Sequence, residues 1–291
     1  MNQTPNSQLP IGIFDSGVGG LTVYQALHER LPNERFVYLG DTARVPYGTK
    51  SLATVERYAV ENALFLQGHG IKLLVVACNT ASALALPAVE RAVAVPVVGV
   101  IEPGARAAVE AIGADGRIGV IATEATIGSH AYRAAIERLA PGATIIEQAC
   151  PLFVSLAEEG WAETDVARTV AAEYLAPLRA ARVEAVVLGC THYPILRRVI
   201  AETLGAQVAL IDSGRAAATA VAALLQTREL MRHTDANETR GESRRLCDDL
   251  DHFYVTDAAA RFARVAERFL GCAPRVLEAV EVWGHDRLAV S

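Results

Sequence analysis

Two short stretches share one pattern, an apolar run that closes on a cysteine followed by small polar residues. Residues 73–77 run directly into Cys78 and Asn79, and residues 184–188 end just before Cys190 and Thr191. A short β-branched run of this kind, followed by a helical pattern, predicts a buried strand that turns into a helix. The two stretches lie in different halves of the chain. The sequence therefore predicts two α/β units whose thiols face each other across a cleft.

The remaining sequence alternates in the same way. Apolar strands are expected at residues 11–14, 35–39, 73–77, 95–101, 117–122, 143–147, 184–188, 207–211 and 253–256. Helical patterns are expected at residues 21–31, 81–93, 164–182, 193–204 and 215–231, the last with Ser213 as its cap. Two further helices are expected, one capped by Ser51 and one that is capped by Asp257 and ends at Gly271. Strands that alternate with helices are typical of parallel α/β sheets.

The order of these elements occurs twice. Ile-Gly-Val-Ile at 118–121 echoes Ile-Gly-Ile-Phe at 11–14, and in each half a later strand ends at a cysteine. This indicates an internal duplication. We expect two pseudo-symmetric parallel-sheet α/β domains with the active site in the cleft between them. The first comprises residues 1–102 and 212–291, and the second residues 103–211, with the chain crossing near Glu102 to Gly104.

Composition excludes several classes of protein. At 291 residues the chain exceeds the usual size of one core, and a net charge of −6 argues against a general nucleic-acid binder. Every apolar run is interrupted before the ~18 residues that a membrane span requires. Residues 1–10 lack the features of a secretory signal and are expected to form a mobile tail, and the charged segment 232–251 a solvated loop. Five scattered cysteines favour a reducing cytoplasm over a disulfide framework.

Polar residues cluster at the predicted strand ends, where α/β sheets bind ligands. A thiol at a helix N-terminus is expected to have a lowered pKa. A thiolate on one face of a substrate and a thiol on the other could remove a proton and return one to the opposite face. The competing interpretation is that each cysteine is simply a small buried hydrophobe, and Cys150, Cys247 and Cys272 are assigned to that class.

Other chemistries are weaker but stay open. Gly17 to Gly20 follow a strand without completing a nucleotide-binding motif, which favours a tight turn around a small anion. Zinc at Cys78, Cys190 and His192 lacks the usual ligand spacing, and a Cys190–His192 hydrolase dyad requires neighbouring residues on a turn to pair. Pyridoxal phosphate needs a lysine, but neither Lys50 nor Lys72 lies at a strand end. We therefore expect no cofactor and no metal.

Four blocks resemble the signatures of the glutamate racemase family, within the cofactor-independent aspartate/glutamate racemase superfamily. They are IGIFDSGVGGLTV (11–23), DTARVPYG (41–48), ACNTAS (77–82) and LGCTHYP (188–194). The resemblance runs from Ile11 to Phe253. It implies interconversion of L- and D-glutamate, supply of D-glutamate for peptidoglycan, and a homodimer. The departures are the segment before Ile11 and residues 232–251.

The resemblance also implies roles for individual residues. Cys78 and Cys190 match the two catalytic thiols, with Asp15, His192 and Glu158 as supporting residues. Asp15 and Ser16 match contacts to the amino group and carboxylates of the substrate, and Tyr47 and Gly48 match contacts to its side-chain carboxylate. Contacts to the α-carboxylate are matched by Asn79, Thr80 and Thr191. His192 matches a substrate-binding residue beside the second cysteine. The alternatives are a racemase for aspartate or another amino acid, a non-catalytic amino-acid-binding regulator, and a zinc hydrolase.

Overall fold

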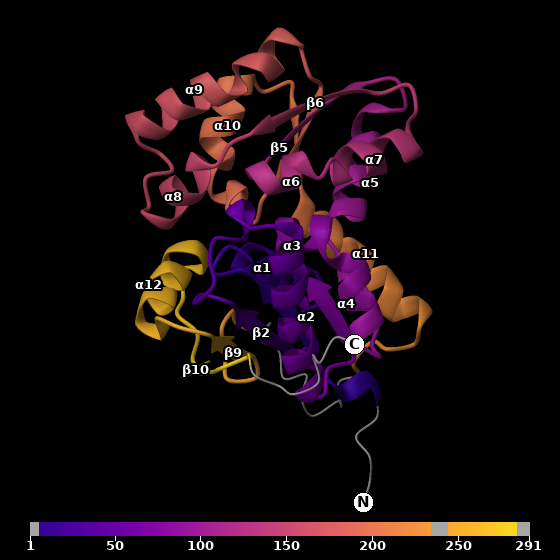
Figure 1. The fold of residues 1–291 in the computed structure, drawn as a ribbon, viewed down its shortest axis with the longest axis vertical. Coiled ribbons are helices and arrows are strands. Elements are labelled where there is room, and N and C mark those ends of the chain that lie inside the picture. Colours follow the sequence, from indigo (N-terminus) through magenta and orange to yellow (C-terminus); the bar gives the residue numbers. More distant parts are fainter. Residues whose placement is uncertain (1–5, 234–243, 284–291) are drawn as a thin grey trace, which may run out of the picture.

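The computed structural model describes residues 6–233 and 244–283, and in this part the chain forms two parallel β-sheets (Figure 1). The first sheet has the strand order β10-β9-β2-β1-β3-β4. Its strands are β1 (Ile11–Asp15), β2 (Phe36–Gly40), β3 (Leu73–Val76), β4 (Val97–Gly99), β9 (His252–Val255) and β10 (Leu277–Ala279). The predicted strand at 95–101 is thus shorter, and β10 was not predicted.

The second sheet repeats part of this order. Its order is β6-β5-β7-β8, and its strands are β5 (Arg117–Ala122), β6 (Thr144–Ala149), β7 (Ala185–Gly189) and β8 (Ala209–Asp212). The sequence β2-β1-β3-β4 in the first sheet matches it position for position. Cys78 follows β3 and Cys190 follows β7, so the two cysteines occupy equivalent places. The prediction of two pseudo-symmetric parallel α/β units is confirmed.

Helices cover both faces of each sheet. The helices are α1 (Leu21–Arg30), α2 (Leu52–Gly68), α3 (Asn79–Leu84), α4 (Leu86–Ala92), α5 (Ile101–Ile112), α6 (Glu124–Gly128), α7 (Ala131–Leu139), α8 (Leu152–Glu158), α9 (Asp165–Ala180), α10 (Arg197–Leu204), α11 (Ser213–Thr227) and α12 (Ala259–Leu270). Short 3₁₀ turns occur at η1 (Asn6–Gln8), η2 (Tyr47–Thr49) and η3 (Tyr193–Leu196).

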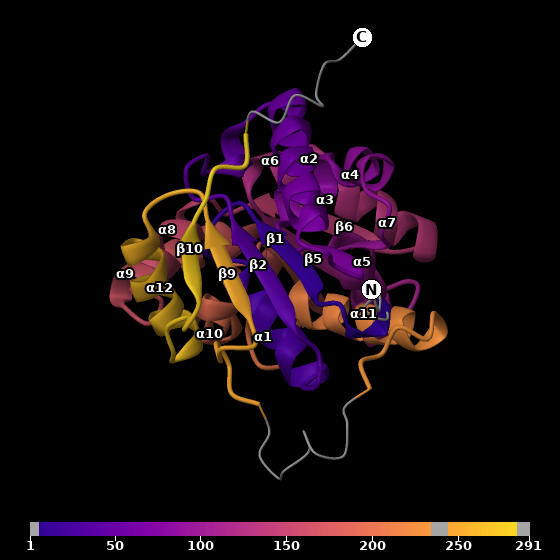
Figure 2. The same ribbon diagram turned by 90° about the horizontal axis from the view of Figure 1, so that it is seen from below.

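The strands are buried on both faces, as parallel sheets require. In the first sheet Val76 packs with α2 to α4, whereas Val75 faces α1, α11 and α12, and Figure 2 shows this sheet between α2 and α1. In the second sheet Val120 packs with α5 and α7, and Val186 with α8 to α10. One apolar core continues from the first sheet into the second. This layering brings the carboxyl ends of β1, β3, β5 and β7 to one region.

The expected crossing near Glu102 to Gly104 falls in the first turn of α5, where the missing N–H of Pro103 costs nothing. Two predicted helix caps were wrong for local physical reasons. Ser213 does not cap α11: the Asp212 carboxylate accepts hydrogen bonds from Gly214 and Arg215 N–H. Asp257 does not cap α12 either, since the cap position is Ala258 in a left-handed conformation. The Ser51 cap and the stop at Gly271 are confirmed.

Two segments that were predicted to be exposed make buried contacts. Residues 1–5 and 234–243 lie outside the described residues. Ser7 accepts a hydrogen bond from the buried Lys72 ammonium through its carbonyl oxygen. Asp251 is buried and accepts from the Tyr24 hydroxyl and the Phe36 N–H, while also pairing with Arg244. Tyr24 and Phe36 lie 227 and 215 positions from Asp251, and Lys72 lies 65 from Ser7, so the local pattern did not reveal these contacts.

None of the helices within residues 6–233 and 244–283 combines the length and apolarity needed to cross a bilayer.

Candidate active site

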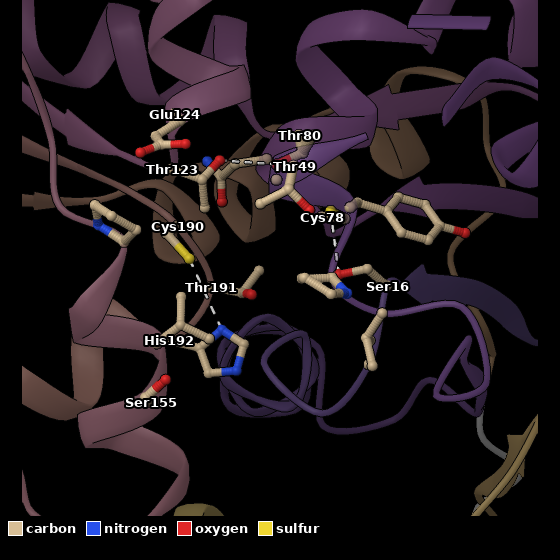
Figure 3. Close-up of a pocket in the computed structure, with 18 of the residues that line it drawn as sticks. Ser16, Thr49, Cys78, Thr80, Thr123, Glu124, Ser155, Cys190, Thr191 and His192 are labelled. Atoms are coloured by element: carbon tan, nitrogen blue, oxygen red, sulfur yellow. Dashed lines mark hydrogen bonds between the residues drawn. The ribbon is translucent and has the colours of Figure 1, made fainter. Parts of the chain in front are cut away.

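A cavity of about 210 Å³ lies where the carboxyl ends of the two sheets meet (Figure 3). It is smaller than the roughly 300–1,000 Å³ typical of sites for drug-sized ligands. Of the sequence-predicted residues, Ser16, Tyr47, Gly48, Cys78, Asn79, Thr80, Glu158, Cys190, Thr191 and His192 line it. In Figure 3 the two cysteines reach the cavity from different segments. The geometry therefore gathers thiols, hydroxyls and one imidazole around a space for a small polar ligand.

Cys78 is held at the start of α3 by two weak hydrogen bonds. Its sulfur accepts from the Ala81 N–H at 3.5 Å, and its thiol donates to Ser16 Oγ at 3.6 Å. The first contact is that of a helix cap, and β3 supplies the rigid approach. The buried strand thus delivers the thiol to the cavity wall.

The expected lowering of the Cys78 pKa is wrong. Burial and, to a smaller extent, the nearby Asp15 carboxylate raise the pKa of Cys78 to about 12, because both disfavour the thiolate. The hydrogen bonds from Ala81 and Ser16 oppose this shift but are outweighed. In the ligand-free protein Cys78 is therefore a protonated thiol at neutral pH.

Cys190 has different neighbours. His192 Nδ1 lies 3.8 Å from Cys190 Sγ, and His192 Nε2 lies 3.0 Å from Glu158 Oε1. Burial lowers the pKa of His192, but the hydrogen bonds to Cys190 and Glu158 outweigh it and raise the pKa to about 10. The hydrogen bond from His192 in turn lowers the pKa of the Glu158 carboxyl. Side chains so close together on a turn seldom pair, but here Cys190, His192 and Glu158 form a chain of contacts.

The glycine loop after β1 packs against the second cysteine turn. A Cβ at Gly19 would lie 2.2 Å from Thr191 Oγ1 and 2.5 Å from the His192 ring, so only glycine fits there. Thr22 Oγ1 donates to the Thr191 carbonyl at 2.8 Å. This close approach explains the glycines better than the predicted turn around an anion.

Asp15 is not part of the cavity lining. It is fully buried, and burial raises the pKa of its carboxyl, against the opposing charge of His192. Its carboxylate accepts from the Gly17 N–H at 2.9 Å and from Thr191 Oγ1 at 3.5 Å. Asp15 thus connects the first strand with the Cys190 turn.

The turn at Tyr47 and Gly48 brings the first unit against the second. A Cβ at Gly48 would lie 2.9 Å from Thr123 Cβ. The Tyr47 hydroxyl points away into a buried network, donating to Asp41 and accepting from Asn62 Nδ2 at 3.0 Å. The Tyr47 ring thus anchors the turn.

A second anchor of this turn is Arg44. Its guanidinium donates to Asp41 at 2.8 Å, to Asn62 Oδ1 at 3.0 Å and to Glu61. No local pattern indicated this network, because Glu61 and Asn62 belong to the middle of α2.

Threonine hydroxyls join the two units at the cavity edge. Thr80 Oγ1 lies 3.1 Å from both Thr123 Oγ1 and Thr126 Oγ1. Asn79 Nδ2 donates to the Tyr132 hydroxyl at 2.8 Å and to Ser213 Oγ at 3.3 Å. The Asn79 amide nitrogen is therefore engaged in linking α3 to α7 and α11, and Thr80 presents a hydroxyl from the same turn.

Some lining residues were not predicted as site residues. Thr123 and Glu124 begin α6, Thr49 follows Gly48, and Ser155 lies on α8. Thr123 directly follows β5, and a polar residue at the end of a predicted strand was the available signal. Ser155 had none, because α8 itself was not predicted.

Lysines and metal-ligand clusters do not contribute to this cavity. Lys50 is outside the lining, and the buried Lys72 pairs with Glu34 at 2.5 Å. Within the described part of the chain, no group of three or more His, Cys, Asp or Glu residues is arranged to hold a metal ion. The donor set that a zinc hydrolase requires is therefore not gathered in those residues.

Comparisons with known proteins identify the family of this chain. The family model described as Asp/Glu/Hydantoin racemase matches residues 11–221. A glutamate racemase of Geobacter metallireducens is 54% identical over 261 residues, which cover 90% of this chain and 92% of that protein. The crystal structure of the isoform RacE1 from Bacillus anthracis superposes with a TM-score of 0.85 at 35% identity, covering 94% of this chain and 98% of the other. That of the Francisella tularensis glutamate racemase in complex with D-glutamate gives 0.84 at 40% identity, covering 95% and 98%.

The family match covers all four sequence blocks, β1 to β4 of the first sheet and the whole second sheet, so the resemblance seen in the sequence is confirmed. In this chain, equivalent cysteines follow β3 and β7, and both line one small cavity. A relative at 54% identity is a glutamate racemase. The chain belongs to the Asp/Glu/hydantoin racemase family and, within it, to the glutamate racemases.

Proposed function

We propose that this protein interconverts L- and D-glutamate with Cys78 and Cys190 as its two acid–base groups. The observation that supports this most is the equivalent placement of the two thiols at one cavity, after the matching strands β3 and β7. Two groups on opposite faces of a carbon are what inversion by proton transfer needs.

In this mechanism one sulfur, as a thiolate, takes the proton from the substrate α-carbon. The electron pair of the broken C–H bond delocalises into the α-carboxylate. The other sulfur, as a thiol, then gives its proton to the opposite face, and the new C–H bond has inverted configuration. Each turnover exchanges the protonation states of the two cysteines, so the reverse reaction starts from the other sulfur.

The surroundings suggest how the resting protein is poised. Cys78, with its pKa raised to about 12, is the proton donor of the free state. Cys190 has the protonated His192 at 3.8 Å, and the Nδ1–H can hydrogen-bond the sulfur while it is a thiolate. Glu158 holds the other imidazole nitrogen and keeps the ring oriented.

The cavity lining can hold the two carboxylates of glutamate. Thr80 and Thr191 supply hydroxyls next to the two cysteines, in line with their assignment to the α-carboxylate. The backbone of Asn79, rather than its engaged side-chain nitrogen, is the better donor, because the first N–H groups of a helix have no partner within it. The Tyr47–Gly48 turn faces Thr123 and is assigned to the side-chain carboxylate, with Ser16 and Asp15 near the ammonium group.

No cofactor is part of this proposal. The substrate carboxylate and the two sulfurs account for every proton and electron pair that moves. A pyridoxal Schiff base would need a lysine at the cavity, and Lys50 and Lys72 lie outside its lining.

The biological role proposed is supply of D-glutamate for peptidoglycan, in the cytoplasm, by a homodimer. The family membership supports the first, and the five free cysteines are compatible with a reducing compartment. We further propose that residues 1–102 with 212–291, and residues 103–211, act as two domains that open and close the cavity. The strands support this division, because β1 to β4 pair with β9 and β10 in one sheet while β5 to β8 form the other.

Circular dichroism of each glutamate enantiomer tests the reaction directly. The protein should racemise both, and Cys78→Ala and Cys190→Ala should each lose roughly 10²- to 10⁴-fold in rate. Cys272→Ala, a half-buried cysteine outside the cavity, is the matched control. Near-full activity in either of the first two variants would refute the two-thiol mechanism.

A panel of aspartate and other amino acids tests the substrate. Racemisation of aspartate in preference to glutamate would contradict the assignment of the Tyr47–Gly48 turn. Binding of glutamate without turnover would instead favour a regulator.

A further inference from the structure

Helix α12 belongs to the first-sheet unit but reaches the catalytic residues of the second. It lies between β9 and β10 in sequence, and its apolar face, with Phe262 and Val265, packs in the core that includes α1. Figure 1 shows α12 next to α8, the helix that ends at Glu158. The two helices meet at the junction of the two units.

Three side chains of α12 make this contact. Arg261 Nη2 donates to Glu158 Oε2 at 3.1 Å, while the other oxygen of the same carboxylate holds His192 Nε2 at 3.0 Å. Arg268 donates to the backbone carbonyl of Glu158. The Phe269 ring stands at 88° to the His192 ring, with centroids 6.0 Å apart.

The geometry of these contacts is regular. Arg261 and Arg268 are seven residues, about two turns, apart, so they project from the same side of the helix. Arg268 binds a carbonyl at the end of α8, one of the four that lack partners within a helix. The Arg268 side chain also packs against Gly160, where an added Cβ would lie 3.1 Å from it.

Burial increases along the chain of contacts. The side chain of Arg261 is 58% exposed, that of Glu158 26% and that of His192 9%. The outer arginine is therefore screened by solvent, whereas the inner imidazole is not. Arg261 cannot touch the substrate from this position, but it orients the carboxylate that orients the histidine.

We propose that Arg261, Arg268 and Phe269 are positioning residues of the racemisation, which act on Cys190 through Glu158 and His192. The inference rests on the proposed two-thiol function. Since α12 comes from the first-sheet unit and the Glu158–His192 pair from the second, the contact forms only when the two units are together. Closure of the cavity therefore also orients His192, the partner of Cys190.

A double-mutant cycle tests whether Arg261 acts through Glu158. Arg261→Gln should lower kcat/KM for both enantiomers roughly three- to fivefold, as expected for a partly exposed ion pair. In a Glu158→Gln background the same substitution should change kcat/KM by less than about 1.7-fold, because the group it acts on is gone. Arg261→Lys, which keeps the charge, should recover part of the loss.

Arg264→Gln is the control, an exposed arginine one turn away on the same helix. It should leave kcat/KM unchanged, and thermal unfolding should show that all variants are folded. An equal loss from Arg261→Gln in both backgrounds, or none in either, would overturn the proposal. Such a result would leave the two-thiol mechanism standing, whereas active Cys78→Ala or Cys190→Ala variants would remove the mechanism itself.

Discussion

The Cys78 and Cys190 sites occupy equivalent positions in two sheets of the same order but have opposite surroundings. Cys78 meets a hydroxyl and lies near the buried carboxylate of Asp15, and its pKa is raised to about 12. Cys190 meets His192, whose pKa is raised to about 10, and a chain of contacts that continues to the surface. The repeated fold thus supplies two similar scaffolds, and a few side chains make one thiol a proton donor and give the other a cationic partner.

The largest effect on the racemisation rate is expected when His192 is replaced. His192→Asn takes away the cation beside Cys190 and should lower kcat/KM roughly 100-fold, the lower end for acid–base assistance. Steady-state racemisation of both enantiomers measures it. Because the two enantiomers are equally stable, the loss must be equal in the two directions, and unequal losses would reveal an assay artefact. A loss below about threefold would mean that the two thiols are not distinguished by His192.

The pH dependence of Cys78 sharpens the comparison. In Cys190→Ala only Cys78 can remove the α-proton, and it must first be a thiolate. Below a pKa of about 12 the thiolate fraction rises tenfold per pH unit, so deuterium exchange from solvent into its reactive enantiomer should rise roughly tenfold per unit between pH 7 and 9. NMR of the α-hydrogen measures the rate. A rate that is flat over this range would contradict the raised pKa.

Contact between the two units can be weakened without touching either thiol. Gly48→Ala places a Cβ 2.9 Å from Thr123 Cβ and should raise KM for glutamate roughly fivefold or more, because overpacking costs about 1 kcal/mol or more. Gly128→Ala is the matched control, since its Cβ would meet nothing within 4 Å. Equal KM values in the two variants would show that the Gly48 contact does not shape the cavity.

The smallest effect is expected at Ser16. Ser16→Ala removes a 3.6 Å hydrogen bond to Cys78 and should lower kcat/KM by roughly two- to fivefold, as for an ordinary neutral hydrogen bond. The contrast with His192→Asn is the informative quantity. If Ser16→Ala were as damaging as His192→Asn, the asymmetry between the two sites would be lost.

The parts predicted correctly from sequence were those encoded locally. The strands before Cys78 and Cys190 were visible as apolar runs, and the repeated order of elements indicated two related sheets. The predicted site residues also line one cavity, apart from Asp15, which is not part of the lining.

What was missed depends on distant contacts. Arg261 meets Glu158 across 103 positions, and Asp251 meets Phe36 across 215. The error in the Cys78 pKa also involves a distant residue, since the buried strand was predicted but the charge of Asp15 near the thiol was not. A local pattern reports the backbone, whereas these effects arise from packing.

The central claim is that each thiol serves one face of the substrate. The direct measurement is exchange of the α-hydrogen of L- and D-glutamate in D₂O, with Cys78→Ala and Cys190→Ala each given each enantiomer. The account predicts that racemisation by each variant falls at least about 100-fold, that each exchanges one enantiomer only, and that the two variants exchange opposite enantiomers. Exchange of the same enantiomer by both variants, or near-full racemisation by either, would contradict it.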